Sequence, residues 1–460
     1  MRRLGLGTLL VATSSLALMH GALAGGFDRG SSSIELLFDP ARIATESGVT
    51  YVSPQRTIKN VQRARSETDT LANRVRGGLI QAGAPAPVAT AVTNGLRQPA
   101  LSSESVDIGG DYAVPRLGAK FNLWEPVDCL ASYTRPYGAD ADYGRNNAYS
   151  ITATRFEVDT DEYSLTCSYK FALENGHQVR VIGGGSYQEI DAFLSRQTLL
   201  DFGNEGEGKF ELSDGAWSYR LGGAYEIPEI AFRASLVYTG SYDYDLTGTV
   251  DTTGFGANGA PISGAVGARL AAIAAGLGLP AGALRAPLTT GVYAVDAQTE
   301  IPQAVEFRLQ TGIAADTLAF ASVRWQDWSQ LQSVPINGVI SPTSGEVNPD
   351  VSFDAFYEDG WTISAGVGRK FTEQLSGLAS VTWDKGTSTF LGTQSDTYNF
   401  AVGGSFIPKE NVEFRLGGSL GVLTGGRSDF EPNGDPANDI TYEYDADLVA
   451  AVSGSFRLKF

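Results

Sequence analysis

The stretch NVEFRLGGSLGV, residues 411–422, decides the fold class because apolar side chains occupy every second position. One face of this segment carries Val412, Phe414, Leu416, Gly418, Leu420 and Val422. The other face carries Glu413, Arg415, Gly417, Ser419 and Gly421. A period of two residues is typical of a β-strand with one apolar face. The segment therefore predicts a strand that separates an apolar environment from a polar one.

Two further segments repeat this alternation. In 229–244 the apolar face comprises Ile230, Phe232, Ala234, Leu236, Tyr238, Tyr242 and Tyr244. In 445–460 it comprises Ala446, Leu448, Ala450, Val452, Phe456, Leu458 and Phe460. Strands of soluble sandwiches usually run about 5–6 residues, whereas these match the roughly 9–11 residues of a tilted strand that crosses a bilayer. Charges such as Arg233, Arg415 and Arg457 then face a lumen, and we expect an all-β, transmembrane antiparallel barrel.

The N-terminus has the features of a secretory signal peptide. Arg2 and Arg3 precede the apolar run 4–19, and Ala22-Leu23-Ala24 is a cleavage site of the small-x-small type. The alternative is a retained anchor helix. We assign residues 1–24 to the signal peptide, 25–48 to a segment before the barrel, and 49–460 to the barrel itself.

The connections between the expected strands alternate in length, as in outer-membrane barrels with short periplasmic turns and long outer loops. Short turns are expected near 125–126, 175–176, 228–229, 315–316, 373–374 and 408–409, and long loops near 59–107, 138–158, 194–214, 246–298, 333–359, 385–395 and 423–439. Six turns and seven loops predict about fourteen strands. The chain ends in a strand on Phe460, which resembles the assembly signal of bacterial outer-membrane proteins and implies the barrel-assembly machinery as a partner.

Composition narrows the possible functions. Without Arg2 and Arg3 the chain has 32 basic and 52 acidic residues, a net charge of -20, which argues against a nucleic-acid partner. The two histidines are His20, in the signal peptide, and His177, in an expected turn, so a Ser–His catalytic site is not expected. We expect no enzyme activity, no cofactor and no metal site. The acidic residues Asp140, Asp142, Asp159, Asp161 and Glu162 are expected to form the solvated face of an outer loop, the alternative being a divalent-cation site.

Two further features leave alternatives open. Cys129 and Cys167 lie in an oxidising compartment, where a disulfide and two free thiols are both possible. Residues 66–92 and 264–284 have helical sequence within outer loops, and 264–284 is apolar. An exposed apolar loop helix indicates either a ligand site or simple packing between loops.

Several stretches resemble the FadL/TodX family of outer-membrane transporters for hydrophobic compounds. They are, in chain order, Gly25-Gly26-Phe27, Ser31-Ser32-Ser33, Asp39-Pro40-Ala41, Thr134-Arg135-Pro136-Tyr137-Gly138, Ile301-Pro302, Trp325-Gln326-Asp327-Trp328-Ser329 and YEDGW at 357–361. The resemblance implies a monomeric fourteen-stranded barrel with an N-terminal plug in its lumen. The chain departs from the family in its short plug segment and in Asp39, where the family has Asn.

The resemblance also implies a transport route. Ligand would be captured between outer loops and would leave sideways, through the wall, at a kink in the third strand formed by Pro136, Tyr137 and Gly138. Asp39, Pro40 and Ala41 would hold the plug near that strand, and Phe27 would reach a ligand pocket. The implied cargo is a long-chain fatty acid or another hydrophobic small molecule, and the surrounding partner is outer-membrane lipid.

An arginine is the natural partner of a fatty-acid carboxylate because its guanidinium forms bidentate hydrogen bonds. The inward-facing candidates are Arg155, Arg233, Arg308, Arg324 and Arg415, each with the alternative of a lumen charge paired to a nearby acid. Apolar ligand contacts are expected from Phe27, Leu277, Leu279, Phe320 and Trp328. Trp325 and Trp383 have the opposite phase and are expected at the membrane interface. The alternative functions are a general or solute-specific porin and a surface adhesin.

Overall fold

The computed structural model describes most of the chain beyond the N-terminal leader. The described residues are 26–30, 33–63, 76–77, 79–81, 83, 85–90, 102–145, 147–197, 207–255, 275, 290–340, 347, 351–429 and 440–460. The signal-peptide residues, Ser31, Ser32, Leu277, Leu279 and most of both expected loop helices lie outside them. Among the described residues, no helix is long and apolar enough to cross a membrane.

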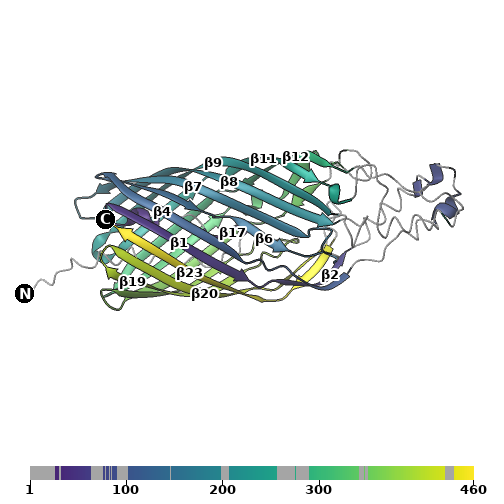
Figure 1. The fold of residues 1–460 in the computed structure, drawn as a ribbon. Coiled ribbons are helices and arrows are strands. Elements are labelled where there is room, and N and C mark those ends of the chain that lie inside the picture. Colours follow the sequence, from purple (N-terminus) through teal and green to yellow (C-terminus); the bar gives the residue numbers. More distant parts are fainter. Residues whose placement is uncertain are drawn as a thin grey trace, which may run out of the picture.

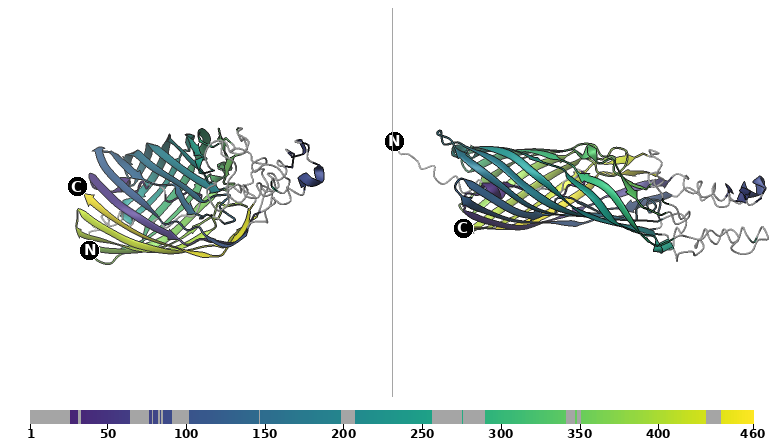
Figure 2. Two further views of the ribbon diagram at one scale, coloured as in Figure 1. Left: turned by 45° about the vertical axis from the view of Figure 1, so that its right-hand side comes forward. Right: turned by 90° about the horizontal axis from the view of Figure 1, so that it is seen from above.

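Fourteen wall strands built from the described residues close into an antiparallel barrel (Figures 1 and 2). They are β1 (Ile43–Pro54), β4 (Tyr112–Trp124), β5 with β6 (Val127–Thr134 and Gly138–Asp142), β7 (Arg155–Ala172), β8 (Gln178–Gln197), β9 (Glu207–Ile227), β10 with β11 (Phe232–Thr239 and Tyr242–Asp251), β12 with β13 (Val292–Ile301 and Ala304–Ala314), β14 (Thr317–Gln326), β17 (Gly360–Lys370), β18 (Leu375–Asp384), β19 (Thr397–Lys409), β20 (Val412–Leu423) and β23 (Asp447–Lys459). The predicted fold class and strand number are confirmed.

The last strand closes the wall against the first. β23 pairs with β1, and the backbone of Phe460 exchanges hydrogen bonds with that of Ile43, at N···O distances of 2.8 and 3.1 Å. Because β1 begins at Ile43, residues 43–48 belong to the wall rather than to the plug segment, whose predicted boundary at residue 48 was therefore too late.

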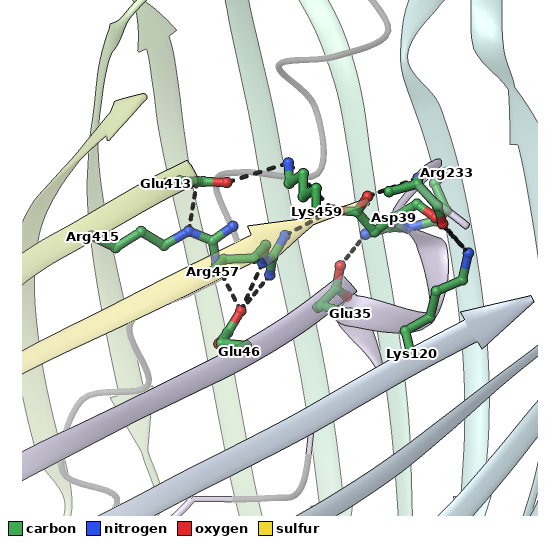
Figure 3. Close-up of polar contacts among 10 residues, drawn as sticks. Glu35, Asp39, Glu46, Lys120, Arg233, Glu413, Arg415, Arg457 and Lys459 are labelled. Carbon is green, nitrogen blue, oxygen red and sulfur yellow. Dashed lines mark hydrogen bonds and ion pairs between the residues drawn. The ribbon is translucent and has the colours of Figure 1, made fainter. Parts of the chain in front are cut away.

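Smaller elements lie at the outer end and in the lumen. A four-stranded sheet of β21 (Gly426–Ser428), β22 (Ile440–Tyr444), β2 (Thr57–Arg63) and β3 (Ser102–Asp107) extends the wall outward (Figure 1). The remaining elements are β15 (Ser333–Asn337), β16 (Ser352–Asp354) and the 3-10 helices η2 (Glu35–Phe38), η4 (Pro228–Ile230), η5 (Thr253–Phe255) and η6 (Trp328–Gln330). Helix η2 follows the first described residues and lies inside the barrel (Figure 3).

The outer surface of the wall has the layered polarity of a membrane protein. Exposed aromatic side chains toward the loop end include Tyr163, Trp217, Tyr219, Trp361 and Tyr398, and those toward the short-turn end include Tyr169, Phe171, Phe371, Phe406 and Phe460. Exposed aliphatic side chains such as Leu165, Leu221, Leu236, Val402 and Leu416 lie between these two groups. An apolar band flanked by aromatic girdles is the arrangement of an outer-membrane barrel.

One predicted face was wrong. β10 ends at Thr239 and β11 begins at Tyr242, and the interruption shifts the alternation by one residue. Leu236 remains on the outer face, but Tyr242 and Tyr244 are only 1% and 2% exposed and point into the lumen. The Tyr242 hydroxyl there donates a hydrogen bond to Glu162 at 2.9 Å.

Candidate binding chambers and wall opening

The plug is held in the short-turn half of the lumen by buried ion pairs (Figure 3). Glu35 of η2 pairs with Arg233 and, at 3.3 Å, with Arg308. Asp39 lies 3.3 Å from both Arg457 and Lys459 of β23. These contacts join the plug to β10 and β13, from the middle of the sequence, and to β23, at its C-terminal end.

Charge stabilises the ionised form of Glu35 despite its burial. Burial alone raises the pKa of this carboxyl, but the guanidinium groups of Arg233 and Arg308 outweigh burial and hold the pKa below its ordinary 4.5. Glu35 is therefore a carboxylate at neutral pH, and the plug is anchored by full charges.

A polar cavity of about 80 Å³ lies beside η2. We call it the polar chamber; its lining includes Glu46, Arg116, Leu378, Ser405, Arg415 and Ser455. An alkyl chain in this chamber would leave charged and hydroxyl groups without water, which costs free energy. The polar chamber is thus an unfavourable path for a hydrophobic molecule.

The loop-side half of the lumen has the opposite character. A second cavity of about 80 Å³, the apolar chamber, is lined mainly by hydrocarbon side chains, among them Phe27, Phe156, Val158, Ile190, Leu212 and Leu246. Among the described residues that line it, Glu300 is the one ionisable group. Removing apolar surface from water contributes about 25 cal/mol per Å², so this chamber favours a hydrophobic ligand.

Phe27 stands between the apolar chamber and a larger cavity. Its ring centroid lies 5.8–6.3 Å from those of Phe156, Trp328, Phe353 and Tyr357. The larger cavity, of about 280 Å³, shares Phe27, Phe156, Leu194 and Phe353 with the apolar chamber and extends to the wall at Gly138–Ala141. We call it the window chamber.

The wall is interrupted where the window chamber meets it. The pairing of β4 with β5 ends at Arg116 and Thr134, after which β6 pairs with β7. The residues between β5 and β6 include Pro136, which has no backbone N–H to contribute to a ladder. We call this opening between β4 and β6 the lateral window.

Comparison with known proteins is consistent with this geometry. The family model described as outer membrane protein transport protein (OMPP1/FadL/TodX) matches residues 36–419. The chain belongs to the FadL/TodX family. Members of this family are transporters and channels of the bacterial outer membrane, and the chain is therefore an outer-membrane channel for hydrophobic compounds.

Solved structures of the FadL/TodX family share the fold. A Pseudomonas aeruginosa FadL homologue is 14% identical with a TM-score of 0.68, over 93% of this chain and 92% of that chain. The Pseudomonas putida toluene transporter TodX is 14% identical with a TM-score of 0.56, over 96% and 98%. The monoaromatic hydrocarbon channel CymD is 12% identical with a TM-score of 0.54, over 93% and 90%. No curated protein matches the chain.

The arginines expected to bind a carboxylate are already paired with acids. Arg324 lies 3.3 Å from Asp28, Arg308 lies 2.8 Å from Glu306, and Arg415 lies 2.7 Å from Glu413. Like Arg233, each of them is paired in the way that the alternative describes, as a lumen charge with an acidic partner. Arg155 does not face the lumen, because it lies on the outer face of β7 and pairs with Glu157 at 2.7 Å.

The aromatic residues expected at a binding site are only partly brought together. Trp328 is buried against Phe27, with its ring edge-on. Phe320 lies on the lumen face of β14, against Gly366, and lines neither the apolar nor the window chamber. Trp325 and Trp383 point outward and donate hydrogen bonds to Asp359 and Asp396, as expected for interfacial residues.

The family motif at Asp39-Pro40-Ala41 lies beside the short-turn half of the third strand and not at its kink, because the Lys120 ammonium that binds the motif also pairs with Asp128 of β5 at 2.8 Å. The Lys120 ammonium donates to the carbonyl oxygens of Asp39 and Ala41 at 3.1 and 2.6 Å, so the motif is fixed to β4 and β23 instead of the kink. The kink itself contacts the chain just after Gly26: Gly138 N–H donates to the carbonyl of Phe27 at 2.7 Å. Tyr137 is buried and accepts hydrogen bonds from Arg324 and Gln326.

The acidic cluster at 140–162 is divided between the two faces of the wall. Glu162 faces the lumen, while Asp159 and Asp161 face outward and pair with Arg29 and Arg135. These residues lie in β6 and β7 and not in an outer loop, so the predicted loop 138–158 was too long.

Cys129 and Cys167 form a disulfide between the neighbouring strands β5 and β7.

Sequence reasoning missed Arg29 and Tyr112, which lie at the lateral window. Arg29 lies outside the wall strands, and Tyr112 is the first residue of β4, so alternation marks neither as part of a site. The available signal was Arg29 itself, a charged residue two positions after the Phe27 of a segment expected inside an apolar pocket.

Proposed function

We propose that this channel takes up neutral hydrophobic molecules or the hydrocarbon tails of amphiphiles, holds them in the apolar chamber, and releases them sideways through the lateral window. The observation that carries the proposal is the division of the lumen. The apolar chamber lies on the loop side of Phe27, the polar chamber lies on the other side, and the window chamber joins the apolar chamber to the wall.

The direction of exit follows from the energetics of the two possible paths. A straight path would take the hydrocarbon past the ion pairs of Glu35 and Asp39 and through the polar chamber. A sideways path leads from the apolar chamber through the window chamber to the wall, past Arg29 and Asp140 but without crossing the ion pairs that anchor the plug. Each CH₂ that stays buried contributes about 0.8 kcal/mol, so the sideways path is favoured more strongly for longer hydrocarbons.

The relatives suggest the cargo classes to test. TodX is a toluene transporter and CymD is a monoaromatic hydrocarbon channel, so these compounds form one class. Fatty acids are the class implied by the sequence resemblance. Among the described residues that line the apolar chamber there is no arginine or lysine for a carboxylate, which favours a neutral compound there.

A matched pair of leucine substitutions tests the proposal. Leu212→Gln places an amide in the apolar chamber, where an unsatisfied polar group costs roughly 1–3 kcal/mol, so uptake should fall about tenfold. Leu378→Gln makes the same change in the polar chamber and should leave uptake within about twofold. Uptake of radiolabelled toluene and oleate is measured in cells that lack another channel of this family.

The two cargoes and one electrical control separate the alternatives. Loss of toluene uptake alone in Leu212→Gln would identify a neutral cargo, and loss of both would indicate hydrocarbon recognition in general. Equal effects of the two substitutions would contradict the proposed path. Large steady conductance of the purified protein in planar bilayers would instead favour the porin alternative.

A further inference from the structure

The lateral window is a bounded opening. On the short-turn side it ends at the Arg116–Thr134 pair. On the loop side Gly110 packs so closely on the Asp140 carbonyl that a Cβ at position 110 would collide with it. Between these limits, β4 and β6 are not paired with each other in the described part of the wall.

The residues after Gly26 run along the free edge of the kinked strand. Arg29 N–H donates to the Pro136 carbonyl at 2.8 Å, Gly138 N–H donates to the Phe27 carbonyl at 2.7 Å, and Asp28 forms a β-bridge with Tyr137. This short segment supplies the edge with the backbone partners that β4 does not.

The Arg29 side chain fills the window. Its guanidinium lies 4.6 Å from the centroid of the Tyr112 ring, on β4, and donates to Asp159 of β7 at 2.6 Å. It also occupies the space that a Cβ at Gly138 would need. Tyr112 and Asp159 stand on opposite sides of the window, so one guanidinium spans it.

The acceptor is on the outside of the wall. Val158 and Thr160, the neighbours of Asp159, are buried toward the lumen, and the Asp159 side chain is 32% exposed. The Arg29 side chain is only 5% exposed. The guanidinium therefore reaches from the plug segment, through the window, to a carboxylate on the outer face.

We propose that Arg29 is the residue that closes the lateral window, and that release of cargo into lipid requires its guanidinium to leave Tyr112 and Asp159. This inference rests on the proposed sideways exit. In the closed state a charge lies across the opening and resists the passage of hydrocarbon in either direction. A charge-assisted hydrogen bond and a cation–π contact are both lost when the window opens.

Three variants test the closure. Arg29→Ala removes the guanidinium, Asp159→Asn weakens its acceptor, and Gly138→Ala adds a methyl group in the guanidinium's place without changing any charge. Glu157→Gln is the matched control, because it breaks an exposed ion pair on the same outer face of β7. Heat-modifiable migration on SDS gels verifies that each barrel is folded.

Two readouts are measured in proteoliposomes. The first is the rate at which a maleimide labels a cysteine introduced at Ala139, which lines the window chamber. The second is the rate of transfer of the neutral probe naphthalene into the bilayer. Arg29→Ala and Gly138→Ala should raise both rates, by about tenfold for the loss of a hydrogen bond to a charged group, and Asp159→Asn should do so less. Glu157→Gln should change neither rate.

The double variant Arg29→Ala with Gly138→Ala is the decisive experiment. Gly138→Ala should have no further effect in an Arg29→Ala background, because the side chain it displaces is gone. Independent, additive effects would overturn the closure by Arg29, as would unchanged labelling in Arg29→Ala. Faster labelling with unchanged transfer would support the closure and instead contradict the sideways exit of the proposed function.

Discussion

At the scale of single residues, the plug depends on charge as much as on apolar packing. The side chains of Leu36, Leu37 and Phe38 pack in a buried cluster with wall residues. Their neighbour Glu35 sits between two arginines, and Arg233 also stacks on the Phe38 ring at 4.1 Å. Removing one partner of a buried pair leaves an uncompensated charge and typically costs about 3–5 kcal/mol.

Glu35→Gln should therefore loosen the plug. Arg308 would keep Glu306, but among the described residues Arg233 would keep only uncharged partners, Gln310 and the Phe38 ring. Because the pKa of Glu35 is lowered, its stabilisation is fully present above pH 4.5 and is lost as pH falls through the lower value of the folded state. Amide hydrogen exchange of residues 33–40 should be slow at pH 7 in the native protein and faster in the variant.

The pH dependence of amide exchange in the plug provides a control for the Glu35→Gln prediction. Exchange, corrected for its intrinsic pH dependence, should accelerate in the native protein below pH 4.5, and the variant should lack this acid response. Glu157→Gln, which breaks an exposed ion pair worth about 0–1 kcal/mol, should leave exchange in the plug unchanged. A variant whose plug exchanges as slowly as the native one would refute an electrostatic anchor.

At the scale of one element, the third wall strand has a fixed side and a free side. On the β7 side, β5 forms eight register pairs and the Cys129–Cys167 disulfide. On the β4 side, β5 also forms eight register pairs, but these end at Thr134, and β6 has no register pair with β4 in the described wall, so the lateral window begins there. The part of the strand after Thr134 can therefore open toward β4 while its other edge stays attached to β7.

Replacing both cysteines with serine tests this asymmetry. The disulfide joins residues 38 apart in sequence, and a loop of that size corresponds to about 3–4 kcal/mol of stabilisation through the unfolded chain. The variant should unfold at a lower urea concentration in detergent, and cargo uptake should be unchanged because the window is on the other edge. Increased naphthalene transfer would mean that the β5–β7 seam also contributes to the exit.

At the scale of the whole molecule, the sequence predicted what depends on local alternation. The faces of β20 and β23, the fourteen strands and the short turns all follow from residue periodicity and turn residues. Alternation fails where a strand is interrupted, as between β10 and β11, because a one-residue shift exchanges the two faces. It also cannot show partners distant in sequence, such as Asp39 and Arg457, which are 418 residues apart.

The candidate site shows the same limit. Phe27 and Pro136 were found through family motifs, but the lining of the apolar chamber comes from many strands and is visible only once the barrel closes. Arg29 reaches Asp159 across 130 residues of sequence. Residue periodicity therefore predicts the strands of the wall, whereas the contacts inside the lumen can be identified only from the three-dimensional structure.

Two arginine substitutions at the same level of the wall, one on each face, test which face meets lipid and which meets the lumen. Val402 of β19 is exposed on the outer face, four residues from each of Tyr398 and Phe406, which belong to the two aromatic girdles. Val402→Arg should cost about 2–4 kcal/mol, as for arginine near the bilayer midplane. Leu378→Arg lies at the same height, since Leu378 pairs with Gly403, but its guanidinium would enter the polar chamber near Glu46. We expect Leu378→Arg to lower the free energy of unfolding much less than Val402→Arg. Reversible urea unfolding in lipid vesicles measures both values. Equal losses of stability would mean that the lipid and lumen faces have been assigned wrongly.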